Sequence, residues 1–86
     1  MEAYDIIKYP LATEKAMRLM EAENKLVFVV NKTSTKLEIR KAIEKLFTAK
    51  VTAVNTVQNV KGQKRAYVTF AKETPAIDIA TNLGIM

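Results

Sequence analysis

The sequence has no cysteine, no histidine and no tryptophan among its 86 residues. Without cysteine there is no disulfide and no thiol nucleophile, and without histidine there is no imidazole base and hardly any transition-metal site. Carboxylates and lysines are the remaining catalytic groups, and their positions in the sequence do not indicate an acid–base pair. We therefore predict that the chain is not an enzyme and that it needs no cofactor and no metal ion.

Long hydrophobic runs and glycine-rich loops are also missing. The longest unbroken apolar run is Leu26 to Val30, whereas about 20 residues are needed to span a bilayer. The N-terminus lacks the basic region and apolar core of a signal peptide. Gly62 stands alone in its region, so no phosphate-cradling loop is present. We expect one cytoplasmic domain over residues 1–86, with no membrane insertion and no small-molecule substrate.

The charges are unevenly distributed along the chain. The net charge is +5 and the isoelectric point is about 9.6. Residues 1–24 hold three cations and five carboxylates, residues 25–72 hold eleven cations and two carboxylates, and the remaining tail adds two acids. A basic middle between acidic ends indicates one surface that meets a polyanion and another that meets a different partner.

Two helices and a buried strand are predicted in the first half of the chain. Thr13 is typical of an N-cap and starts a helix that ends near Ala22. Leu26 to Val30 is apolar throughout, which favours a central strand covered on both faces. Thr35 and Glu38 form a capping-box pattern ahead of the second helix. The core positions of that helix follow helical spacing: Ile39, Ala42, Ile43, Leu46 and Phe47.

Short elements are predicted at both ends of the chain. Tyr4 to Ile7 has the pattern of a short edge strand, and Lys8-Tyr9-Pro10 interrupts it because proline cannot donate to a strand ladder and restricts the residue before it. Thr74 as N-cap, followed by Pro75, starts a short last helix that Gly84 stops. That helix would cover the core with Ile79 and Leu83.

The segment from Val51 to Ala71 is predicted to form a hairpin. Valine, threonine and aromatic residues favour strands on both sides of a turn, which we place at Lys61 to Arg65 because Gly62 can adopt a positive φ. Alternation in the first strand drifts between Ala53 and Val57, which indicates a bulge or cover on both faces. The second strand alternates between a face with Ala66, Val68 and Phe70 and a face with Arg65, Tyr67 and Thr69.

These elements predict an α+β fold. The order is β-α-β-α-β-β with a short C-terminal helix, and the strands form a small, largely antiparallel four-stranded sheet on which the helices pack.

Three cations flank Gly62, more than a turn needs; a solvated loop tip is the plain interpretation, and phosphate binding is the functional one. Arg65 beside Tyr67 offers a stacking surface of the kind that RNA binders use. The run Gln63 to Phe70 partly matches an RNA-recognition signature, but Lys64 and Arg65 stand where that signature has glycine and a stacking aromatic.

Several motifs together resemble the family of large-subunit ribosomal protein twenty-three, in its archaeal branch. The matching segments cover nearly the whole chain. They are Lys8 to Ala16 (KYPLATEKA), Val54-Asn55-Thr56, Lys61-Gly62, Lys64 to Val68 (KRAYV) and the closing Leu83 to Met86. Bacterial members carry a long basic extension between the hairpin strands, and here only Lys61 to Lys64 separates Val60 from Arg65.

The resemblance implies a structural protein of the large subunit that binds ribosomal RNA near the polypeptide exit tunnel. It also implies contacts with neighbouring ribosomal proteins and a docking surface for the signal recognition particle or a nascent-chain chaperone, formed by Glu14 with Arg18 and Glu21 on the same helix. With two further lysines of the basic middle, the expected RNA-binding residues are Lys8, Thr13, Lys15, Lys32, Lys36, Asn55, Thr56, Lys61, Lys64, Arg65 and Tyr67. A stand-alone single-stranded RNA binder that depends on Tyr67, and a protein-interaction module whose basic charge only keeps it soluble, remain the alternatives.

Overall fold

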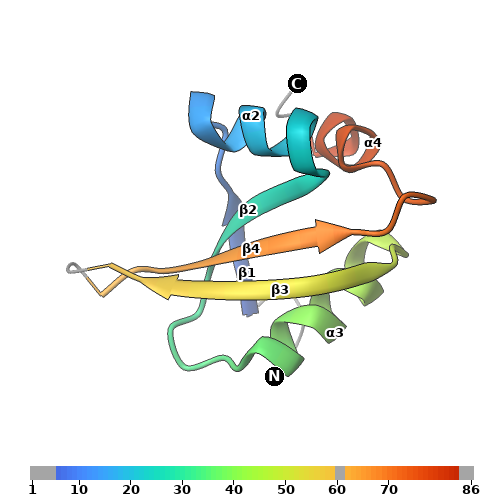
Figure 1. Ribbon diagram of the computed structural model, residues 1–86. Helices are drawn as coiled ribbons and strands as arrows, with labels where there is room; N and C mark the ends of the chain where they lie inside the picture. Colours follow the sequence, from blue (N-terminus) through green and yellow to red (C-terminus); the bar gives the residue numbers. More distant parts are fainter. Residues whose placement is uncertain (1–5, 60–61, 84–86) are drawn as a thin grey trace.

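The computed structural model describes residues 6–59 and 62–83, and their helices and strands follow the predicted α+β order (Figure 1). The bounds are β1 Ile7–Pro10, α2 Glu14–Glu23, β2 Lys25–Val30, α3 Lys36–Phe47, β3 Val51–Gln58, β4 Lys64–Phe70 and α4 Ala76–Asn82. In Figure 1, α2 and α4 lie next to each other, and α3 lies on the other side of the β3–β4 hairpin.

The four strands form one sheet in the order β1-β2-β4-β3, and every neighbouring pair is antiparallel. This arrangement confirms the predicted antiparallel sheet. β2 lies inside the sheet, and each residue from Leu26 to Val30 is at most 4% exposed. The prediction of a central strand covered on both faces is therefore confirmed, because a strand buried on both faces needs no polar alternation.

The structure confirms the two predicted faces of the second hairpin strand, but the turn lies earlier in the sequence than predicted. Gly62 has a φ of 80°, as predicted, but β4 already begins at Lys64, so Lys64 and Arg65 are strand residues and not turn residues. Asn59 closes the turn instead, since its backbone N–H donates to the Gln63 carbonyl and its Oδ1 accepts from the Gln63 N–H. Because Lys64 and Arg65 keep their pairing with β2 and β3, their side chains project to opposite faces of the sheet.

The predicted irregularity in β3 is present but lies earlier in the strand. The register between β3 and β4 shifts between Val51 and Ala53, so the bulge falls at Thr52. From Ala53 to Val57 the residues alternate between exposed and half-buried. Cover on both faces of this stretch, the other predicted explanation, is wrong, because only one face of β3 meets the core.

The first strand differs most from the prediction. Tyr4 and Asp5, where we expected it to start, lie outside the described residues, and β1 continues through Pro10. Proline is tolerated because β1 is the outermost strand beside β2, where an edge position does not need every N–H. The register also shifts between Ile7 and Tyr9, which places Tyr9 opposite Val29.

The two long helices begin as predicted. Thr13 Oγ1 accepts a hydrogen bond of 3.1 Å from the Ala16 N–H at the start of α2. At α3, Thr35 and Glu38 form a complete capping box with hydrogen bonds of 3.0 and 3.2 Å. The hydrogen bond from the Thr35 backbone N–H lowers the pKa of Glu38 below its ordinary value, because it stabilises the charged carboxylate.

The last helix has a cap that local sequence could not reveal. The predicted N-cap, Thr74, is not used, and its hydroxyl accepts from the Lys50 N–H instead. Pro75 holds the N-cap position without a side-chain bond, and Asn24 Oδ1 accepts from the Ala76 N–H at 2.6 Å. The prediction failed because the cap comes from a residue 52 positions away. The predicted stop, Gly84, lies outside the described residues.

One hydrophobic core joins all of these elements. It contains the inward faces of β2 and β4 together with side chains from α2, α3 and α4. The fully buried Phe28 stacks on the half-buried Phe47 with ring centroids 5.8 Å apart. Ile79 is buried while Leu83 packs at the margin, as predicted. No helix within the described ranges is long and apolar enough to cross a membrane.

Candidate nucleic-acid interface

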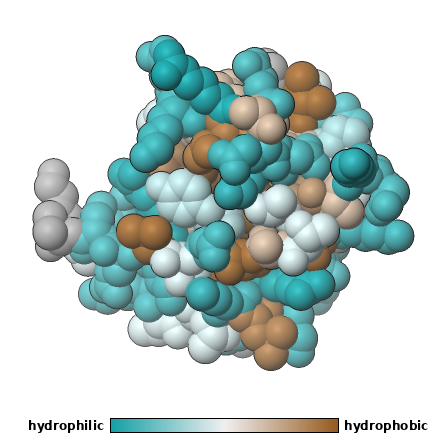
Figure 2. Space-filling model, viewed as in Figure 1, coloured by the Kyte–Doolittle hydropathy of each residue, from teal (hydrophilic) through white to brown (hydrophobic). Residues whose placement is uncertain are grey.

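The face of the sheet opposite the core carries polar and aromatic side chains. Because side chains alternate along a strand, Arg65 and Tyr67 project to this open face while Ala66 and Val68 are fully buried behind them. Asn55 of β3 pairs with Tyr67 and lies on the same face. With β3 and β4 in front, the surface is mainly hydrophilic and its hydrophobic residues form small separate patches (Figure 2). The strands therefore present an open, polar binding surface.

A chain of hydrogen bonds crosses this open face. Gln63 Nε2 donates to the Tyr9 Oη at 3.1 Å, and Arg65 Nε donates to Gln63 Oε1 at 3.3 Å. Gln63 Oε1 also lies 3.5 Å from Asn59 Nδ2. The chain links the outer strand β1 to the central strand β4, so the aromatic ring and the guanidinium group are held relative to each other.

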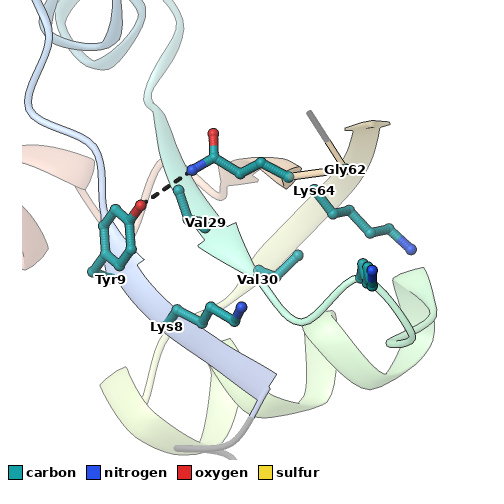
Figure 3. Close-up of a pocket in the computed structure, with 8 residues that line it drawn as sticks. Lys8, Tyr9, Val29, Val30, Gly62 and Lys64 are labelled. Carbon is teal, nitrogen blue, oxygen red and sulfur yellow. Dashed lines mark hydrogen bonds between the residues drawn. The ribbon is translucent and has the colours of Figure 1, made fainter. Parts of the chain in front are cut away.

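A cavity of about 330 Å³ opens at the end of the sheet next to this chain. Figure 3 shows Lys8 and Tyr9 of β1 on one side, Gly62 and Lys64 on the other, and Val29 and Val30 of β2 between them. The residues that line its rim and walls are Lys8, Tyr9, Lys32, Gly62, Gln63 and Lys64. Three predicted RNA-binding lysines thus meet at one hollow, and no acidic residue of the described ranges lines it.

Two predicted site residues face away from the open face. Lys64 pairs with Val30 across the strands, and its Nζ donates to the Ser34 carbonyl at 2.6 Å. Thr56 pairs with the buried Ala66 and is half-buried on the core side. Lys64 therefore reaches the cavity but does not share a face with Arg65, although the two are adjacent in sequence.

Another group of predicted residues meets at the start of α2. Thr13, Lys15, Arg65 and Tyr67 line a small hollow of about 30 Å³. The Thr13 hydroxyl is already engaged as the helix cap, whereas Lys15 is exposed. The structure thus brings the first sequence motif and the Arg65–Tyr67 strand together, as one continuous surface requires.

The remaining predicted RNA-binding residues are less closely grouped. Lys36 is the first residue of α3 and is exposed, but it lines neither hollow. Lys61 lies outside the described residues. Within the described residues, no group of three or more acidic or other metal-ligating side chains could hold a metal ion.

The predicted protein-docking residues lie along the exposed side of α2. Glu14 and Arg18 form an ion pair of 2.8 Å, and their side chains are 83% and 76% exposed. Glu21 is exposed one turn later. An exposed pair of this kind contributes about 0–1 kcal/mol to stability, so neither residue is needed for the fold.

Sequence reasoning did not select Tyr9 or Gln63. The sequence places Tyr9 in a segment that interrupts a strand, whereas in the structure Tyr9 is 47% exposed and lines the cavity. Gln63 was treated as a turn residue, although its amide joins Tyr9 to Arg65. The signal in the sequence was an aromatic residue next to Lys8. To recognise Tyr9 as a site residue from this signal, the register of β1 against β2 must be known.

Comparison with known proteins finds similarity over nearly the whole length of the chain. The family model "Ribosomal protein L23" matches residues 5–80. The large ribosomal subunit protein uL23 of Methanococcus maripaludis strain C7 is 48% identical over 85 residues, which cover 99% of both chains. The protein of the same name from Methanococcus aeolicus is 45% identical with the same coverage, and the one from Methanococcus vannielii is 48% identical.

Proposed function

Because this chain belongs to the ribosomal protein L23 family, we propose that it binds the RNA of the large ribosomal subunit through the open face of its sheet. Family membership makes it a structural ribosomal protein of archaeal type and not an enzyme, as the sequence predicted. It works as part of the ribosome in the cytoplasm. The RNA contacts, the position near the exit tunnel and the docking of targeting factors are the proposed part.

The observation that carries the RNA proposal is the juxtaposition of Arg65 and Tyr67 with the first sequence motif. Arg65 supplies a fixed charge and a planar group for phosphates or bases, and Tyr67 supplies a stacking ring. Lys15 adds an exposed ammonium beside them. The surrounding basic segment, with eleven cations against two carboxylates over residues 25–72, favours many phosphate contacts and hence salt-dependent affinity.

Binding of purified protein to large-subunit RNA fragments across a salt series tests this proposal. We expect selective binding over unrelated RNA, with a log–log slope of about −0.7 to −0.9 for each phosphate neutralised. Arg65→Ala should weaken binding and reduce the slope by about 1. Arg18→Ala removes an exposed arginine that lines neither hollow and pairs with Glu14, and it is the matched control. Equal binding by the Arg65 and Arg18 variants would contradict the assignment of the open face.

We also propose that the exposed side of α2 forms the docking surface for the signal recognition particle or a nascent-chain chaperone. Glu14, Arg18 and Glu21 are exposed and are not required by the core. This side carries the two carboxylates Glu14 and Glu21, whereas within the described residues the linings of the two hollows contain lysines and Arg65 and no carboxylate. The same molecule can therefore be held by RNA and still present a protein-binding surface.

Ribosomes that carry Glu14→Ala test the docking proposal. We expect weaker binding of the signal recognition particle or chaperone with normal subunit assembly. Glu73→Ala is the control, because Glu73 is a similarly exposed carboxylate, paired at 3.7 Å with Lys50 and remote from α2 in sequence. If both variants bind the factors like the unsubstituted ribosome, α2 is not the docking surface.

A further inference from the structure

We propose that the cavity between β1 and the start of β4 holds one unstacked nucleotide of RNA, with its base against Tyr9 and its phosphate among the lysines of the rim. This inference rests on the proposed RNA binding and names the ligand of a site that lies beside the open face. The ligand is a single extruded nucleotide and not a duplex. The evidence is the size of the cavity, its aromatic wall, its charge and its continuity with Arg65.

The size of the cavity fits a small planar ligand. Its volume of about 330 Å³ lies at the lower end of the range of about 300–1,000 Å³ that is usual for ligand pockets. Val29 and Val30 of β2 line its closed end, where both are almost fully buried. Gly62 at the rim has no side chain, and a Cβ built there would meet nothing within 4 Å. A hollow of this size with an open rim accepts a single base, whereas a rigid double helix is too wide to enter.

Tyr9 provides a stacking wall that the protein holds in place. Tyr9 is 47% exposed although its hydroxyl accepts a hydrogen bond from Gln63 Nε2. The hydrogen bond fixes the ring at its outer end and leaves its surface available to the cavity (Figure 3). Proteins that read RNA sequence mostly bind unpaired bases in this way, by stacking them on aromatic rings. The Gln63 amide nitrogen carries a second hydrogen, which can meet an acceptor on the edge of the base.

The charge of the rim fits a phosphate. Lys8 and Lys32 are exposed beside the cavity, and Lys64 is held there by the Ser34 carbonyl at 2.6 Å. Lysines act as point charges toward phosphate oxygens and do not require one fixed geometry. Among residues 6–59 and 62–83 no carboxylate lines this cavity, so none of these residues neutralises the three ammonium groups.

The cavity is continuous with the rest of the proposed RNA surface. Gln63 contacts both Tyr9 in the cavity wall and Arg65 on the open face. An RNA strand whose backbone lies along the open face would therefore pass the cavity mouth. This continuity favours a nucleotide over an acidic side chain of a neighbouring protein, which would not need the aromatic wall.

The test is a double-mutant cycle between the full chain and its RNA. In the selectively bound fragment, each unpaired nucleotide is replaced in turn by an abasic one, and each RNA is measured with the unsubstituted chain, Tyr9→Ala and Tyr67→Ala. We expect Tyr9→Ala to weaken binding by about 5- to 150-fold, the usual effect of losing one stacked base. Removing one particular base should lower the affinity of the unsubstituted chain by a similar factor, but should lower the affinity of Tyr9→Ala little further. For the same abasic RNA, the losses in binding free energy caused by the missing base and by Tyr67→Ala should add. Tyr9→Phe should bind the unmodified RNA nearly as tightly as the unsubstituted chain does, because phenylalanine can still stack.

A second measurement does not depend on the folding of the tyrosine variants. Substitution of the exposed Lys8 and Lys32 by alanine should reduce the salt slope by about 1 for each lysine, whereas the paired control Lys45 and Lys72 should not change it. The nucleotide-binding proposal is overturned if the free-energy loss at every abasic position adds to that of Tyr9→Ala and if the Lys8–Lys32 and Lys45–Lys72 substitutions change the salt slope equally. If Arg65→Ala weakens RNA binding in that same experiment, RNA binding by the open face is still supported. Absence of selective RNA binding by the unsubstituted chain would overturn both.

Discussion

Asn24→Ala should destabilise the protein more than its position at the surface end of a helix implies. Asn24 is the C-cap of α2, with a φ of 56°. Its Nδ2 donates to the carbonyls of Phe70, Ala71 and Thr74 at 3.0–3.3 Å, and its Oδ1 accepts from the Ala76 N–H. One side chain therefore joins the end of α2, the end of β4 and the start of α4.

The expected cost has two parts. Ala76 is 0% exposed, so its N–H loses its acceptor without gaining water, and such an unsatisfied group costs about 1–3 kcal/mol. Alanine in the left-handed conformation adds about 1–2 kcal/mol. With the weakened carbonyl contacts we expect a loss of about 3–5 kcal/mol. This is a large share of the roughly 4–13 kcal/mol expected for a domain of this length.

Urea unfolding monitored by circular dichroism measures this loss, and Asn24→Gly separates its two parts. Glycine tolerates the left-handed conformation, so Asn24→Gly should be about 1 kcal/mol more stable than Asn24→Ala. The control is Asn82→Ala on the exposed end of α4, which should stay within about 0.5 kcal/mol of the unsubstituted chain. An Asn24→Ala loss below about 1 kcal/mol would refute the reasoning, because the N–H of α4 would then have another partner.

Three further predictions follow from the helix termini and the core. Thr48 has a φ of 50°, which is strained for a β-branched residue, so Thr48→Gly should raise the free energy of unfolding by about 0.5–1 kcal/mol in the same urea assay; a loss would contradict this. The lowered pKa of Glu38 means that its stabilisation is present above its ordinary value of 4.5 and is lost as pH falls through the lower folded value. Urea midpoints from about pH 7 to pH 3 should therefore fall less steeply in acid for Glu38→Gln, and parallel curves would refute the link. Ser34 Oγ is buried with no hydrogen-bond partner within the described residues, so Ser34→Ala should be neutral or stabilising, and a loss above about 1 kcal/mol would show a missed contact.

Periodicity and local capping predicted most of the fold. The apolar run of β2, the caps of α2 and α3 and the two faces of β4 were correct because each is determined by residues close in sequence. The cap of α4 and the end of the first strand were wrong because both depend on residues far away in the chain: Asn24 caps α4, and pairing with β2 extends β1 through Pro10.

The candidate site was predictable in composition but not in arrangement. Arg65 and Tyr67 were placed on one face by alternation, and the structure agrees. Adjacent lysine and arginine residues looked equivalent in the sequence, yet Lys64 faces the opposite side and bonds to Ser34. Tyr9 was passed over because its role depends on lying opposite Val29 in an irregular strand pair. Charge therefore indicated the kind of partner, and tertiary pairing decided which side chains can reach it.

The alternation of β4 has a consequence for the entropy of association. Arg65 and Tyr67 are separated by Ala66, which is 0% exposed and fixed in the core. The backbone that carries both contact residues is therefore ordered before any ligand arrives. Ordering a flexible segment would cost about 1–2 kcal/mol for each residue, whereas here only side-chain rotamers remain to be fixed, at about 0.5–1.5 kcal/mol each. The hydrophobic core thus preorganises the recognition surface, so a core mutation that loosens β4 would weaken binding without touching a contact residue.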